Sequence, residues 1–137
     1  LRARHLPWDV GVGEPGLEVR LEAANDRWFA GMRSELPEST RMPYGWTTAL
    51  RRAGLGEVTT RSVLIERSAP LGSEDLALVA DRLRHWVERL READLLEAAD
   101  LDAWDRLLDP DSETWLGQRE DVFWLEVRSV HVGTAPS

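Results

Sequence analysis

The segment DVFWLEVRSVHV, residues 121–132, constrains the fold more than any other part of the chain, because it reads as a strand with two apolar faces. Its large apolar residues fall on both sides: Val122, Phe123, Trp124, Leu125 and Val127. Such a strand needs cover above and below and a neighbour on each side. The only other expected strand covers 57–67, and a ribbon of two strands is marginal by itself. We therefore expect these two strands to complete a larger sheet whose earlier strands precede Leu1.

Four helices are expected from apolar residues that recur at three- and four-residue steps. They cover residues 17–36, 46–53, 74–94 and 101–108. Pro37, Gly54 and Pro110 are typical helix stops, and Ser73 and Asp100 are typical caps of the last two helices. The sequence thus predicts one partial α/β domain over 1–137, with a helical insertion at 74–108 between its two strands.

Composition excludes several classes of function. The formal net charge of −8 argues against sequence-independent binding to nucleic acid or to anionic membranes. The absence of cysteine removes disulfides, thiolate nucleophiles and zinc–sulfur sites. No apolar run approaches the length of a membrane span and no signal-peptide pattern opens the chain, so we expect a cytoplasmic protein that does not bind membranes.

The familiar catalytic and nucleotide-binding motifs do not occur, and no residues stand at metal-ligand spacing. Gly11-Val12-Gly13 reads as a turn, because a preceding apolar strand and a third glycine are missing. His5 sits in an irregular loop beside Arg4 and Trp8. It is either a solvated loop residue or a pocket residue that binds or deprotonates a substrate. Trp8, in a loop, is a candidate for lining a pocket.

The stretch GWTTALRRAGLGEVTTRSVLIE resembles a segment of class I S-adenosylmethionine-dependent methyltransferases, in which a short helix, an Ala-Gly-Leu stop and a strand follow one another. The segment 121–132 resembles the seventh, antiparallel strand of that Rossmann-like sheet, which lies between the fifth and sixth strands. The opening RHLPWDVGVGEPGLEVRLEAA resembles the region that follows the fifth strand. The resemblance implies that the cofactor site lies before Leu1, so no cofactor-binding residue is assigned here. Two helices separate the last two strands where the family's simplest connection is a hairpin.

Two functions remain open from the sequence. In the first, the chain is the substrate-side, C-terminal portion of a small-molecule methyltransferase that uses S-adenosylmethionine. His5 would be the catalytic base, and Arg4, Trp8, Trp28 and Phe29 would bind the substrate; no metal is expected. The insertion at 74–108 would then be a lid, a substrate cover or a dimer surface. In the second, the chain is a non-enzymatic α+β interaction or dimerisation module. A homodimer is compatible with both.

Overall fold

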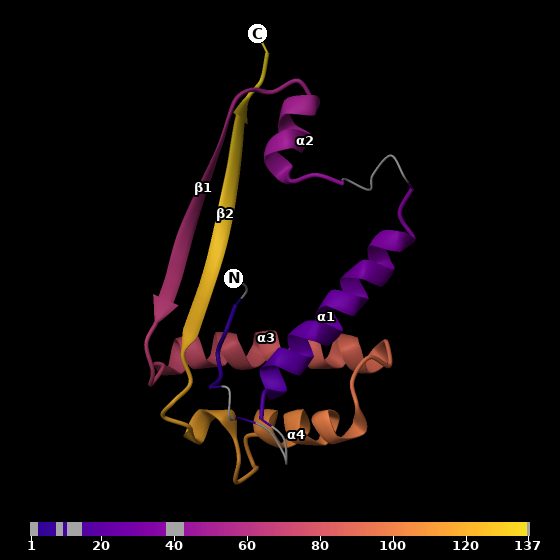
Figure 1. The fold of residues 1–137 in the computed structure, drawn as a ribbon. Coiled ribbons are helices and arrows are strands. Elements are labelled where there is room, and N and C mark those ends of the chain that lie inside the picture. The colour runs from indigo at the N-terminus through magenta and orange to yellow at the C-terminus, as the bar shows by residue number, and fades with distance from the viewer. Residues whose placement is uncertain (1–2, 8–9, 11–14, 38–42, 137) are drawn as a thin grey trace.

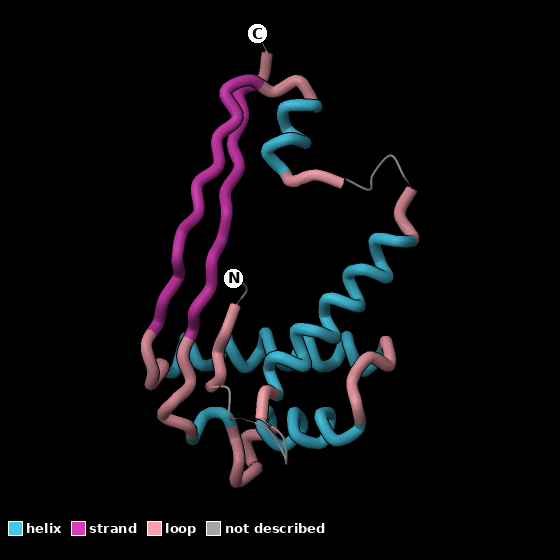
Figure 2. The backbone as a smooth tube through the Cα atoms, viewed as in Figure 1, coloured by secondary structure: helices cyan, strands magenta, loops and turns pink. Residues whose placement is uncertain are grey.

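The computed structural model describes residues 3–7, 10, 15–37 and 43–136. These residues form four α-helices, one short 3₁₀ helix and one antiparallel sheet of two strands (Figure 1). In chain order they are α1 (Leu17–Ser34), α2 (Trp46–Arg52), β1 (Gly56–Arg67), α3 (Ser73–Glu92), α4 (Ala98–Leu108), η2 (Leu116–Gln118) and β2 (Trp124–Thr134). The architecture is α+β, and the expectation of four helices and two antiparallel strands is confirmed. The tube in Figure 2 shows the two long strands extending away from α3 and α4, with α2 beside their far end.

The two strands pair along nearly their whole length. Thr60 lies opposite His131 and Ser62 opposite Ser129, and each of these pairs is also joined by a side-chain hydrogen bond of 2.9 Å. The cross-strand contacts show that alternate residues of β1 share a face, as expected from period-two alternation. Helix α2 lies over that face, because Thr47 shares a hydrogen bond of 2.7 Å with Thr60.

Two element starts, those of β2 and α4, differ by three residues from the sequence-based expectation, for physical reasons. The last strand begins at Trp124, not at residue 121, because Val122 is buried in the helical core and the Phe123 N–H donates to the His5 carbonyl. Helix α4 begins at Ala98, and Asp100 does not cap it. Asp100 instead lies in the first turn and binds the Arg20 guanidinium of α1 at 2.8 Å. Core burial and a backbone hydrogen bond to His5 therefore account for the later start of β2, and a long-range ion pair accounts for the different role of Asp100.

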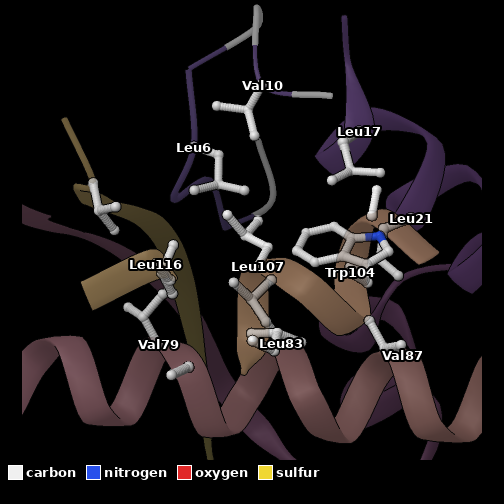
Figure 3. Close-up of a cluster of buried hydrophobic side chains, with 14 of the residues drawn as sticks. Leu6, Val10, Leu17, Leu21, Val79, Leu83, Val87, Trp104, Leu107 and Leu116 are labelled. Carbon is white, nitrogen blue, oxygen red and sulfur yellow. The ribbon is translucent and has the colours of Figure 1, made fainter. Parts of the chain in front are cut away.

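The hydrophobic core lies between α1, α3 and α4 (Figure 3). Trp104 of α4 is completely buried at its centre, together with Leu21 of α1 and Leu83 of α3. Leu6 and Val10, before α1, and Leu116 and Val122, before β2, close the same cluster. Helices α3 and α4, which the sequence suggested as an insertion, thus supply a large share of the core.

The ribbon of β1 and β2 is poorly covered over much of its length. Five large apolar side chains on it are between 36% and 60% exposed: Val63, Leu64, Val127, Val130 and Val132. Because a two-stranded ribbon gains little stability alone, this exposure marks the ribbon as a surface that another structural layer would stabilise.

Candidate functional site

A pocket of about 350 Å³ lies between α1, α3 and the start of β2. Asn25 and Phe29 of α1 and Trp86 of α3 line it, together with Arg82, Glu126, Val127 and Ala3. We call it the aromatic pocket. It joins apolar walls with a few convergent polar groups, and one of these groups, Glu126, has a strongly shifted pKa. That combination is the usual starting point for identifying a binding site.

Glu126 lines the aromatic pocket and is buried, and both of its carboxylate oxygens accept hydrogen bonds. The Arg82 guanidinium donates a hydrogen bond to each of these oxygens, at 2.7 and 3.2 Å. Arg128 Nε donates to Oε1 at 2.8 Å, and Trp124 Nε1 donates to Oε2 at 3.0 Å. The hydrogen bond from Arg82 is the main cause that lowers the pKa of the Glu126 carboxyl from 4.5 to about 2, and it outweighs the opposing effect of burial. Glu126 is therefore an ionised anchor and not an acid or base for catalysis near neutral pH.

Arginine–aromatic contacts lie in the walls of the pocket and directly beside them. The Arg89 guanidinium lies 4.4 Å from the centroid of the Trp28 ring and 5.6 Å from that of Phe29, and its Nη2 donates to Asn25 Oδ1. The Trp28 and Phe29 rings meet edge to face, with centroids 5.0 Å apart. Arg82 lies 5.2 Å from the centroid of Trp86. These contacts fix the orientation of rings that would otherwise rotate freely.

Of the residues predicted to bind substrate, Trp28 and Phe29 therefore lie together, and Phe29 lines the aromatic pocket. Arg4 lies elsewhere: it forms an ion pair of 3.0 Å with Glu22 and lines a second pocket of about 380 Å³. Trp8 lies outside the described residues.

His5 is completely buried and forms a close pair with Glu18 of α1. The Glu18 carboxylate lies 2.7 Å from His5 Nδ1 and accepts hydrogen bonds from the backbone N–H groups of His5 and Leu6, at 2.9 to 3.1 Å. His5 Nε2 is buried and has no hydrogen-bond partner among the described residues. His5 is thus no solvated loop residue. Its enclosure favours a structural role in this conformation, since a general base must reach its substrate; its catalytic role stays a prediction.

Sequence reasoning missed Asn25, Arg82, Trp86 and Glu126 as pocket residues. Trp86 falls among the apolar residues of α3 that recur at helical spacing, which indicates core packing, and Glu126 is a single charge within an apolar strand. The sequence offered one signal for Glu126: a carboxylate within an apolar strand becomes buried, and a buried carboxylate needs a partner cation. The sequence could not identify Arg82 as that cation, because 44 residues separate the two.

Comparisons with known proteins give no assignment. No protein-family model matches the chain, and neither a search of curated proteins nor one of solved structures finds a match. Within the described part of the chain, every helix is too short or too polar to cross a bilayer. The same residues contain no cluster of three or more histidine, aspartate or glutamate side chains arranged to hold a metal ion.

Proposed function

We propose that this chain is the C-terminal, substrate-side portion of a class I S-adenosylmethionine-dependent methyltransferase that acts on a small molecule. The observation that carries the proposal is the position of β2 between two antiparallel neighbours. Arg4 and Leu125 exchange both of their backbone hydrogen bonds, at 2.8 and 2.9 Å, in an antiparallel bridge. Helix α1 follows this bridge in the chain, and β1 pairs with β2 antiparallel as well.

The bridge lies on the edge of β2 that faces away from β1. In an antiparallel pair, alternate residues direct both backbone groups to the same neighbour. Leu125 directs both groups to Arg4, so the segment around Arg4 and β1 flank β2 on opposite sides. Because both run antiparallel to β2, they run parallel to each other, joined through α1 and α2. This order matches the fifth, seventh and sixth strands of the methyltransferase sheet that the sequence resembles.

In such an enzyme, the cofactor would supply its methyl group to a nucleophilic atom of the substrate as the carbon–sulfur bond breaks and S-adenosylhomocysteine leaves, and the protein would act mainly by positioning the two. The cofactor would bind residues before Leu1, and this chain would supply part of the substrate wall. His5, held through Nδ1 by Glu18, would be the base if its Nε2 became accessible on substrate binding. The ligand crevice of an open α/β sheet lies beyond the carboxyl ends of its parallel strands, where α3 follows β1.

The test compares two polypeptides: residues 1–137, and a longer one that includes the roughly 150 residues, a domain-scale length, encoded before Leu1. Titration calorimetry with S-adenosylmethionine should show micromolar binding to the longer polypeptide and none to residues 1–137. The proposal is overturned if the longer polypeptide does not bind the cofactor. It is equally overturned if residues 1–137 bind it with micromolar affinity.

The exposed ribbon favours a second candidate function, a dimerisation module. Every second residue after Leu125 directs its backbone N–H and C=O to the edge of β2 that faces away from β1. These residues are Val127, Ser129 and His131, and no described residue pairs with them there. An open strand edge with exposed valines is a template for pairing with another chain. Sedimentation velocity decides between the two: a stable, discrete dimer of residues 1–137 supports the module, whereas irregular aggregation supports a sheet completed within one polypeptide. A well-behaved monomer would contradict both.

A further inference from the structure

We infer that the aromatic pocket binds a planar aromatic group that carries an anionic oxygen, such as an aryl carboxylate or a phenolate. Its role as the substrate subsite rests on the proposed function, whereas the binding chemistry rests on the pocket alone. The pocket lies near the start of β2, which is the end of the sheet where β1 and the segment around Arg4 have their carboxyl ends. Ligands of open α/β sheets bind at that end.

The walls favour a flat, apolar group. Phe29 is 42% exposed, and Trp86 is half-buried, so both rings offer uncovered surface to the pocket. Their positions are fixed by neighbouring guanidinium groups, Arg89 on Phe29 and Arg82 on Trp86. A ring held by packing and cation–π contacts loses little rotational freedom when a ligand stacks on it, which favours affinity. The volume of about 350 Å³ lies within the range of small-molecule sites.

The polar groups select the ligand's hydrogen-bonding character. The side-chain acceptors of the pocket are occupied: both Glu126 oxygens accept hydrogen bonds from Arg82, Arg128 or Trp124, and Asn25 Oδ1 accepts one from Arg89. Two side chains keep hydrogen-bond donors that a ligand can use. The amide N–H₂ of Asn25 has no partner among the described residues. Arg82 uses only part of its guanidinium N–H groups on Glu126. A ligand must therefore bring an acceptor.

The charge of the site favours an anion. Two guanidinium groups, those of Arg82 and Arg128, bind the carboxylate of Glu126, and a third, that of Arg89, binds Asn25. This local excess of positive charge contrasts with the net charge of −8 for the whole chain. A cationic ligand would be repelled, and a neutral ring would leave the remaining donors unpaired, which costs binding energy. An aryl carboxylate satisfies the walls and the donors together.

The test uses residues 1–137 and benzoate as the probe, followed by ¹H–¹⁵N NMR titration. Binding should be saturable with a Kd on the order of 1 mM, typical of so small a ligand, with shifts centred on Asn25, Phe29 and Trp86. Cyclohexanecarboxylate, which is not planar, should bind at least several-fold more weakly, and benzylamine, which is cationic, should not bind.

Phe29→Ala and Trp86→Ala should each weaken benzoate at least about five-fold, since each removes one stacking surface. Trp46→Ala is the matched control: its ring is 59% exposed on α2 and lies outside the pocket, so binding should be unchanged. Thermal melts confirm that each variant is folded; if Trp86→Ala is not, Phe29→Ala decides, because its side chain is already partly exposed.

Three results would overturn the inference: no saturable binding of benzoate, equal binding of benzoate and cyclohexanecarboxylate, or unchanged binding in Phe29→Ala. Each would identify the pocket as a packing surface for other parts of a protein. The readout is independent of S-adenosylmethionine. If the longer polypeptide does not bind the cofactor, the proposed function is wrong and the aryl-anion site is unaffected. If residues 1–137 do not bind benzoate, the aryl-anion site is wrong and the proposed function is unaffected.

Discussion

Replacing Glu126 by glutamine should destabilise the protein by about 3 kcal/mol at pH 7. The magnitude follows from the pKa of the carboxyl, which falls from 4.5 to about 2 on folding. Each pKa unit corresponds to about 1.4 kcal/mol of preference for the ionised form in the folded state. Glu126 is only 7% exposed, so solvent screens this interaction little, although the full value remains an upper limit. Glutamine keeps the shape but leaves Arg82 without its anion.

The sign of the pH dependence provides a sharper test. Because the folded-state pKa lies below the unfolded value, the stabilisation is complete above about pH 4.5 and is lost as the pH falls toward 2. The difference in unfolding free energy between wild type and Glu126→Gln should therefore shrink to about 1 kcal/mol at pH 3. Urea unfolding at pH 7, 5, 4 and 3 measures it, with Glu113→Gln, at an exposed loop residue, as the control. A difference that stays constant from pH 7 to pH 3 would refute the reasoning.

Three further outcomes are expected. Trp104→Ala should lower the free energy of unfolding by about 3–5 kcal/mol in urea titrations, because it empties the centre of the core; a loss under 1 kcal/mol would contradict this. Glu18→Ala should cost about 2 kcal/mol or more, since it leaves buried donors unpaired, and near-wild-type melting would exclude that role. By hydrogen exchange, the N–H groups of Val127, Ser129 and His131 should exchange faster than those of the residues between them. Equal protection along β2 would show that its outer edge is paired.

Local patterns in the sequence predicted the four helices and the two strands, although not every start or cap. The three- and four-residue spacing of apolar residues predicted all four helices, and α1 and α3 end within two residues of the expected positions. Thr60 and Ser62, two residues apart in β1, share one face, as the alternation of a strand requires. These features depend on neighbours in the chain, which is why periodicity and helix stops predict them.

The candidate site was predictable only in part. The sequence singled out Phe29 and Trp28 as aromatic candidates, and the structure brings them together. It drew attention to His5 because of its irregular loop, but it could not predict the burial of His5 against Glu18, 13 residues away. Whether a histidine meets solvent or a carboxylate depends on how α1 docks, and no local pattern encodes that.

The sequence by itself determined the helices, the two strands, the acidic character of the chain and the apolar nature of its last strand. Only the tertiary structure decided that α3 and α4 form the core with α1, that Arg82 neutralises Glu126, and that Asn25, Phe29 and Trp86 meet around one pocket. The physical reason is the range of the interactions. Helix and strand preferences act over a few residues, whereas ion pairing and core packing join residues that are distant in the chain, and their partners are chosen by the fold as a whole.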